Sequence, residues 1–425
     1  MFEISLPQEV SKIINILEKK GFEAYVVGGC VRDSVMNILN ISSTAPNDWD
    51  ITTSAKPDEV MEILAKEGIK TIPTGIKHGT ITAIIEKQKY EITTYRIEGK
   101  YTSHRTPLEV EFVSTLIDDL SRRDFTINAM AYHPHRGIVD IYEGINHLKQ
   151  QLICAIRDPN ERFEEDALRI LRALRFSARF GFEINEQTSR AIFKHKELLS
   201  FISIERITEE LKGILCGEFA FDILDQYHEV ILFSLTGDKL NYPYYKDAIK
   251  IIPYCPKNPI TRIIVLLYFG IVDEAQRIKI LQRLRFPKWI EKTILDIMKH
   301  LHRSLADEKI WIKQSLSLMG EKNFKIFLEI KNAQMNAKKP ISEDEHLKLH
   351  GIFEKFQKII ENKEPIHIKD LMLDGNDLQT FGIPKGKKIK EMLHKMLEAV
   401  MSEKISNDKK SLEDFVYQNI DKLHV

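Results

Sequence analysis

Apolar and polar positions follow two different patterns along this chain. Up to about residue 145, short apolar runs between glycines and polar residues are typical of strands, with short helices between them. The runs 80–86 and 90–96 flank Lys87-Gln88-Lys89 and predict a hairpin. From about residue 161 onward, apolar residues recur at helical spacing between prolines. The pattern predicts an α/β head that carries an elongated helical body.

The first predicted strand runs directly into two glycines. Residues 23–27 end at Gly28-Gly29, and a helix is predicted from about Val31 to Leu39. Glycine lets the backbone approach a phosphate closely, and the N–H groups of a helix N-terminus favour an anion. Arg32 would lie in the first turn, where its guanidinium can contact a triphosphate. This segment therefore predicts a phosphate site.

Two carboxylates follow this segment at Asp48 and Asp50. Residues 48–53 predict a strand, on which positions two apart share a face. Paired carboxylates repel each other unless a cation lies between them, and hard oxygen ligands favour Mg²⁺, whose coordination shell substrate phosphates often complete. The alternative is that both side chains face solvent, since an isolated Asp-x-Asp is common. Together with the glycine turn, the pair favours a metal site for nucleotidyl transfer.

A third polar segment spans residues 121–130 and is predicted to be a loop that enters a helix. Arg123 and Asp124 would reach the nucleotide, while Phe125, Ile127 and Met130 would pack inside. A surface ion-pair cluster is the alternative interpretation.

Charged residues recur every three positions in the strongly helical segment 164–179. Asp166, Arg169, Arg172 and Arg175 would therefore share one helix face, either as a solvated ion-pair ladder or as a nucleotide site. A carboxylate beside a guanidinium matches a base edge with an amino group next to a ring-nitrogen acceptor. Cytosine and adenine have such an edge, whereas guanine and uracil do not. The segment predicts selection of CTP and ATP.

Composition narrows the class of protein. The 425 residues contain 62 Lys and Arg and 62 Asp and Glu, so net charge neither indicates nor excludes an RNA partner. The four cysteines are widely separated and predict neither a zinc site nor a disulfide framework. No apolar run is long enough to span a membrane and no signal peptide is evident, so a cytoplasmic location is expected.

Several segments together resemble the successive motifs of the class II, or bacterial-type, tRNA nucleotidyltransferase and poly(A) polymerase family. The segments are Gly28-Gly29-Cys30-Val31-Arg32-Asp33, Asp48-Trp49-Asp50, Arg122-Arg123-Asp124-Phe125-Thr126-Ile127-Asn128, Glu165-Asp166-Ala167-Leu168-Arg169 and the helical segment 203–211. They lie in the first half of the chain. The resemblance implies an α+β fold with a nucleotidyltransferase-type mixed-sheet head, followed by an elongated all-helical neck, body and tail. The corresponding domains would be 1–148, 149–212, 213–335 and a tRNA-binding tail, 336–425.

The resemblance also implies an activity, which is the addition of C, C and A to the 3′ end of tRNA without a nucleic-acid template. Asp48 and Asp50 would be the catalytic residues and would hold Mg²⁺. Triphosphate contacts would come from Gly29, Arg32 and Arg123. The incoming nucleotide would also contact Asp166, Arg169, Arg172 and Arg175.

Other activities in this family remain alternatives. The segment 98–107 resembles a flexible loop that CC-adding members lack or shorten, and Asp166-Ala167-Leu168-Arg169 replaces the Asp-Pro-Val-Arg of poly(A) polymerases. A-adding enzymes share nearly every motif and remain the main alternative. A non-catalytic RNA-binding protein is disfavoured because Asp48 and Asp50 are both present.

A basic segment in the predicted tail offers a candidate RNA contact. Lys385, Lys387 and Lys388 lie in a loop that enters a helix, where they could bind tRNA phosphates. A solvated helix face is the equal alternative.

Overall fold

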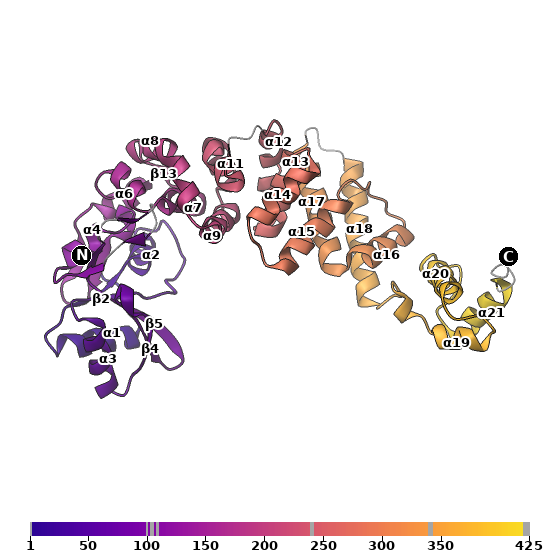
Figure 1. Cartoon of the computed structure of the whole chain (residues 1–425), viewed down its shortest axis with the longest axis horizontal. Helices are drawn as coiled ribbons and strands as arrows, with labels where there is room; N and C mark the ends of the chain where they lie inside the picture. The colour runs from indigo at the N-terminus through magenta and orange to yellow at the C-terminus, as the bar shows by residue number, and fades with distance from the viewer. Residues whose placement is uncertain are drawn as a thin grey trace. The chain divides into compact units, whose positions relative to one another are not determined.

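The structure of the chain is a computed structural model that describes residues 2–98, 101–102, 106–107, 110–238, 242–338 and 343–419. The chain forms two compact units (Figure 1). The first comprises Met1–Asn241 with Arg283–Arg285, and the second comprises Tyr242–Gln282 with Phe286–Val425. The finer division at residues 148, 212 and 335 stays a prediction.

The head of the first unit is built on a seven-stranded sheet. Its strand order is β11-β10-β1-β2-β5-β4-β3. Strands β2 and β5 run parallel and the other neighbouring pairs run antiparallel, so the predicted mixed sheet is confirmed. The strands are β1 Ala24–Val27, β2 Ile51–Thr53, β3 Lys70–Gly75, β4 Thr80–Ile85, β5 Gln88–Thr94, β10 Met130–His133 and β11 Gly137–Asp140.

Strand β1, in the interior of the sheet, is buried along its whole length because both faces of the sheet are covered. Alternate residues of a strand point to opposite faces. Tyr25 and Val27 pack with Leu116 and Leu120 of one helix, α4. The helices that cover the sheet are α1 Gln8–Glu18, α2 Gly29–Ile38, α3 Pro57–Lys66 and α4 Leu116–Ser121.

Local structure departs from the sequence prediction at three places in the head. The predicted hairpin forms, but its turn is Glu86-Lys87, and both residues have positive φ. Strand β2 begins at Ile51, after the two aspartates. The segment after Arg123 enters a short 3₁₀ helix, Thr126–Asn128, and then strand β10 instead of an α-helix. Phe125, Ile127 and Met130 are fully buried, as predicted.

The head is followed by helices, with one small exception. Strands β12 Leu152–Ile153 and β13 Glu183–Ile184 form a parallel pair, so the prediction of an all-helical segment 149–212 is wrong there. The segment 164–179 is not one helix either, because Asp166 is extended, with φ −132° and ψ 101°. The helices of this part are α6 Pro159–Glu165, α7 Leu168–Phe180, α8 Glu186–His195, α9 Ile204–Cys216, α10 Ala220–Gln226 and α11 His228–Thr236.

The described residues of the second unit form helices and connecting segments, and no strand. Its last part has a core of its own, to which α20 and α21 contribute Met392, Met396, Leu412 and Val416. In the described part of the chain, no helix is both long enough and apolar enough to cross a membrane. The α-helices that lie wholly in this unit are α12 Tyr245–Ile249, α13 Pro259–Gly270, α15 Lys288–His300, α16 Lys309–Met319, α17 Glu321–Ala337, α18 Glu343–Glu361, α19 Gly375–Thr380, α20 Lys387–Met401 and α21 Lys409–Asn419.

Glycines bring α9 close to α7. A Cβ on Gly217, at the C-terminal end of α9, would lie 2.4 Å from the carbonyl oxygen of Ala178, and one on Gly213 would lie 2.5 Å from Cδ of Arg175. Both distances are shorter than any ordinary contact. The approach of the two helices therefore depends on the missing side chains.

Two glycine-to-alanine substitutions should have opposite effects on the stability of the protein, one at this contact and one in open space. Gly217 has φ −62°, which alanine adopts without strain, so Gly217→Ala should destabilise through the clash alone, by about 1–3 kcal/mol. Gly351 lies inside α18 with open space around it, so Gly351→Ala should stabilise by about 0.5–1 kcal/mol. Thermal unfolding of the two variants measures both effects. A Gly217→Ala protein as stable as the unsubstituted chain would contradict the packing argument.

Candidate active site

One cavity of about 910 Å³ opens on the first unit. The Gly28-Gly29 turn, Asp50 and the segment 122–124 line its head side. Residues of α7 and α9 line the opposite side and contribute several arginines. The glycine turn, one of the two aspartates and the predicted nucleotide-selecting residues therefore meet in one place.

The Gly28-Gly29 turn forms the N-terminal end of α2, as the sequence predicts. Gly28 has φ 81°, a conformation that favours glycine, and its carbonyl accepts from the backbone N–H of Arg32. A Cβ on Gly28 would lie only 3.0 Å from Nη1 of Arg123. The guanidinium of Arg123 therefore lies directly against the glycine turn.

Arg32 is held rigidly in the wall of the cavity. Its Nε donates to Asp33 at 2.7 Å and its Nη1 donates to Oδ1 of Asn128 at 2.6 Å. The guanidinium also lies over the rings of Phe176 and Phe180, 5.4 and 5.0 Å from their centroids. Burial lowers the pKa of Arg32, and Asp33 opposes this shift. A pre-oriented cation of this kind binds an anion without first losing side-chain entropy.

Asp48 and Asp50 lie just before strand β2. The backbone of Asp50 continues the sheet, because its carbonyl accepts from the N–H of Val27 at 3.0 Å. Asp50 faces the cavity. Burial and the negative charges of Glu91 and Asp48 raise the pKa of Asp50 to about 6, although the positive charge of Arg123 opposes this shift. The sequence prediction missed Glu91. It lies beside Asp50 because β5 pairs in parallel with β2, with Ile51 opposite Ile92, and this register cannot be read from sequence.

The donor set fits a hard divalent cation. Two carboxylates near each other, with a third negative charge at Glu91, attract a cation, and Mg²⁺ commonly uses one or two carboxylates together with substrate phosphates. Within the described ranges, no three His, Cys, Asp or Glu side chains are grouped to hold a metal by themselves. The arrangement therefore suits a cation that the nucleotide helps to coordinate.

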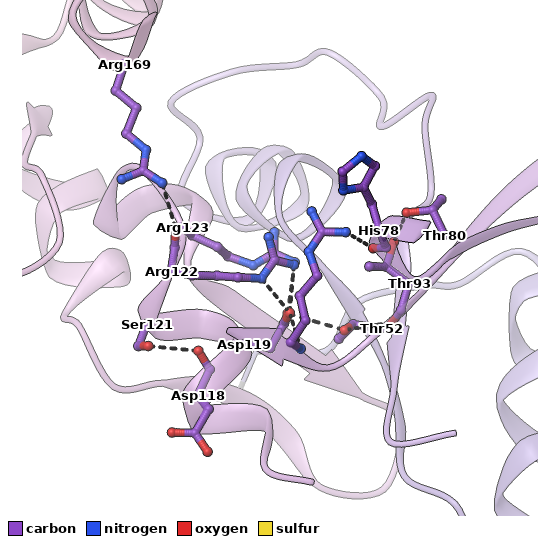
Figure 2. A network of polar contacts seen from close by, with 11 residues as sticks. Thr52, His78, Thr80, Thr93, Asp118, Asp119, Ser121, Arg122, Arg123 and Arg169 are labelled. Atoms are coloured by element: carbon purple, nitrogen blue, oxygen red, sulfur yellow. Dashed lines mark hydrogen bonds and ion pairs between the residues drawn. The ribbon is translucent and has the colours of Figure 1, made fainter. Parts of the chain in front are cut away.

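All three residues of the segment 122–124 line the cavity, and each is held by partners in the protein. Arg122 and Arg123 line the cavity and both donate to the buried carboxylate of Asp119, as Figure 2 shows. Asp124 is 8% exposed and accepts from Arg172 and from the backbone N–H of Phe125. Burial by itself would raise the pKa of Asp124, but Arg172 and several hydrogen bonds have a larger, opposite effect. The pKa is therefore lowered to about 2. Asp124 therefore holds Arg172 instead of reaching freely toward a nucleotide.

Asp166 and Arg169 lie in the same wall but not on one helix face. Asp166, in the break between α6 and α7, accepts from the backbone N–H of Leu168 and pairs with Nη2 of Arg206 at 2.9 Å. Arg169 is 6% exposed and donates to Glu165. Its Nη1 also donates to the carbonyl of residue 162, and its Nη2 donates to the carbonyl of residue 122. The prediction that Asp166 shares one helix face with the arginines is therefore wrong, and Asp166 and Arg169 each have a specific protein partner.

Arg172 and Arg175 extend this wall along α7. Arg172 pairs with Asp124 at 2.6 Å, and Nε of Arg175 lies 3.1 Å from Oε2 of Glu210 on α9. Glu210 is 6% exposed, and burial raises its pKa while Arg175 and Arg172 oppose the shift. The sequence prediction missed Glu210 and Arg206 as site residues, although both lie in the segment 203–211 that carried part of the resemblance.

Two further predictions concern other parts of the chain. Half of the predicted flexible loop, 98–107, lies outside the described residues; within it, Glu98 ends strand β6 Arg96–Glu98, and Tyr101–Thr102 and Thr106–Pro107 form a short antiparallel pair. In the second unit, Lys385 and Lys387 are exposed at the start of α20 and Lys388 is partly exposed. Their role in RNA binding stays a prediction.

A mixed sheet with paired aspartates beside a glycine turn, faced by an arginine-rich helix, defines a nucleotidyltransferase. The poly A polymerase head domain family matches residues 24–154, and the family described as the probable RNA and SrmB-binding site of polymerase A matches residues 181–234. The putative tRNA nucleotidyltransferase domain 2 family matches residues 258–416.

Individual relatives narrow the class further. The CCA-adding enzyme of Anoxybacillus flavithermus (strain DSM 21510 / WK1) is 33% identical over 416 residues, which are 97% of each chain. The CCA-adding enzyme of Enterococcus faecalis (strain ATCC 700802 / V583) is 45% identical over 210 residues, 49% of each chain. The crystal structure of Bacillus stearothermophilus CCA-adding enzyme in complex with CTP matches with a TM-score of 0.79 and 27% identity over 99% of each chain. This chain belongs to the family of CCA-adding enzymes.

The raised pKa of Asp50 predicts that Asp50→Asn stabilises the metal-free fold. The pKa of Asp50 is about 6 in the folded state, against an ordinary value of 3.8, so ionisation of this carboxyl lowers the free energy of unfolding. The loss is complete above about pH 6 and is absent below pH 3.8. Asp50→Asn removes this cost. We expect a higher thermal unfolding midpoint than that of the unsubstituted chain at pH 7.5 in EDTA.

A pH series is the internal control for this prediction. The difference in midpoint between Asp50→Asn and the unsubstituted chain should shrink as the pH falls from 6 toward 4. A variant that is less stable at pH 7.5, or a difference that does not depend on pH, would show that Asp50 is not destabilised by its surroundings.

Proposed function

We propose that this chain completes the 3′ end of tRNA by adding C, C and A from CTP and ATP, without a nucleic-acid template and with release of pyrophosphate. One observation carries the proposal. A single cavity contains a carboxylate suited to a divalent cation, a rigid set of arginines and the Asp166–Arg169 pair that can read a base edge. Reaction chemistry, triphosphate binding and base selection can therefore act on one nucleotide. Because tRNA is the proposed substrate, we expect the protein to act in the cytoplasm.

Asp48 and Asp50 are the proposed catalytic residues and Mg²⁺ ligands. When bound, Mg²⁺ would supply a Lewis acid that polarises the α-phosphate and favours deprotonation of the tRNA 3′-hydroxyl. At neutral pH Asp50 is mostly ionised, since its pKa is about 6, and so is available as a ligand. Glu91 adds negative charge that strengthens the attraction for a cation.

The proposed triphosphate contacts are Gly29, Arg32 and Arg123. Backbone N–H groups at the start of α2 favour an anion, and both guanidinium groups are held by protein partners next to this turn. Charge-assisted hydrogen bonds from fixed donors would stabilise the leaving pyrophosphate. Arg172 and Arg175 are proposed to contact the incoming nucleotide from α7.

Asp166 and Arg169 are proposed to select the base. Ion pairs with Arg206 and Glu165 hold their side chains. An acceptor at Asp166 and a donor at Arg169 suit the amino group and ring nitrogen of cytosine or adenine. Guanine and uracil would put an oxygen where Asp166 needs a donor.

The activity can be tested with three tRNA substrates that end before CCA, after the first C and after CC. Each NTP is offered separately and in mixture, with Asp48→Ala as the inactive control. Incorporation of C, C and A into the shortest substrate is expected. Incorporation of A alone, into the CC-ended substrate, would identify an A-adding enzyme. No incorporation into any substrate would exclude the proposed activity and favour an RNA-binding role.

Asp166→Ala should reduce discrimination among the four NTPs. Loss of the acceptor removes the penalty against guanine and uracil, so the preference for CTP and ATP should fall by about 10-fold or more, as expected for one base-reading pair of about 1–3 kcal/mol. Single-turnover incorporation on the three tRNA substrates measures this preference. Glu161→Ala, an exposed carboxylate on α6, is the matched control and should select normally. Unchanged selection by Asp166→Ala would exclude its role.

Neutralising the lysines at the start of α20 should weaken tRNA binding. If Lys387 and Lys388 contact phosphates, their replacement by alanine should reduce the salt dependence of log K by up to about 0.9 per lost contact on a duplex. Replacement of Lys409 and Lys410, two exposed lysines at the start of α21, is the matched control. Equal affinities and slopes for both double variants would indicate a solvated surface.

A further inference from the structure

Asp119 lies at the centre of a polar network behind the cavity wall. The side chain is 0% exposed, and its two oxygens accept from four other residues. Oδ1 accepts from Nε and Nη2 of Arg122 at 2.9 and 2.7 Å, and from the backbone N–H of Arg96 at 3.4 Å. Oδ2 accepts from Nη2 of Arg123 and from Oγ1 of Thr52, both at 3.3 Å. Figure 2 shows the arginines converging on this carboxylate.

The carboxylate is ionised and matched by cations. Burial by itself would raise the pKa of Asp119, but Arg122 and Arg123 have a larger, opposite effect. The pKa of Asp119 therefore lies below its ordinary value. A buried carboxylate of this kind fixes its partners firmly, because moving either guanidinium away would leave the charge uncompensated. Arg122 and Arg123 line the cavity in front of it.

The partners of Asp119 come from segments that serve different parts of the site. Thr52 lies in β2, two residues after Asp50, whose carbonyl accepts from the backbone N–H of Val27 in the neighbouring strand β1. Arg123 lies against the Gly28 turn and its charge lowers the pKa of Asp50, so its guanidinium is near both the glycine turn and this carboxylate. The carboxylate of Asp119 therefore connects strand β2, which follows Asp50, with the guanidinium of Arg123.

The network also extends toward the base-selecting wall. The carbonyl of Arg122 accepts from Nη2 of Arg169 at 3.1 Å (Figure 2). A displacement of Arg122 would therefore be transmitted to Arg169 through this hydrogen bond.

We propose that Asp119 is a positioning residue that holds the guanidinium of Arg123 against the glycine turn, in a fixed position relative to strand β2. Asp119 thereby sets the affinity of the protein for the nucleotide triphosphate. The inference rests on the proposed function, since it assigns Arg123 to the triphosphate. Asp119 itself does not touch the substrate. Its loss should weaken nucleotide binding by misplacing Arg123, before any effect on base choice.

The test compares Asp119→Asn and Asp119→Glu with Asp118→Asn. Asp118 is the neighbouring, partly exposed carboxylate of α4, which makes Asp118→Asn a matched control for the loss of charge. We expect both Asp119 variants to raise the dissociation constant for CTP and the KM for CTP and ATP by about 10–100-fold, the usual effect of removing a supporting partner. Asp118→Asn should match the unsubstituted chain.

Equilibrium binding of CTP without tRNA separates positioning from chemistry. If Asp119→Asn does not fold, Asp119→Glu keeps the charge and displaces the carboxylate by one methylene, so the same rise is expected in a folded protein. CTP affinity and KM equal to those of the unsubstituted chain in a folded Asp119 variant would overturn the inference.

A double variant gives an independent result. Arg123→Ala combined with Asp119→Glu should bind CTP no more weakly than Arg123→Ala alone, because both changes remove the same contact. Additive losses would overturn the inference. An unsubstituted chain that binds CTP but adds nothing to tRNA would instead contradict the proposed function and leave the role of Asp119 in nucleotide binding testable.

Discussion

The site depends on the compensation of charge in a wall that is largely shielded from water. Asp119, Asp124 and Glu210 are nearly or fully buried, and each is opposed by arginines that line the cavity. Burying an unpaired carboxylate or guanidinium would cost several kcal/mol, so neither member of a pair can move alone. The arginines are thereby held toward the cavity in fixed orientations. The pairing creates a rigid cationic surface on which a triphosphate can bind.

The same requirement explains why α7 and α9 approach so closely. Glu210 on α9 can reach Arg175 on α7 only if the helices are in tight contact, and the side-chain-free positions Gly213 and Gly217 permit that contact. Packing and electrostatics are therefore not separate contributions here. A methyl group at Gly213 would occupy the space through which the Arg175 side chain passes.

The sequence could predict the features that local chemistry decides. The Gly28-Gly29 turn forms where predicted because φ 81° at Gly28 and the start of α2 are properties of adjacent residues. The break at Asp166 was not predicted, because the neighbouring residues are strong helix formers and a distant ion pair with Arg206 accompanies the extended backbone. Asp119 and Glu91 were missed for the same reason. Their partners are set by tertiary contacts and by a parallel strand register that no local pattern reveals.

Partners also divide the carboxylates of the head into two functional groups. Asp119 and Asp124 face guanidinium groups, and their pKa values lie below the ordinary range despite burial. Asp50 faces Glu91 and Asp48 with Arg123 as its opposing charge, and its pKa is raised to about 6. The fold thus neutralises the carboxylates that support the wall and leaves excess negative charge at Asp50, which also lines the cavity. Such local excess is costly in the free protein, and the divalent cation proposed for this site would relieve that cost on binding.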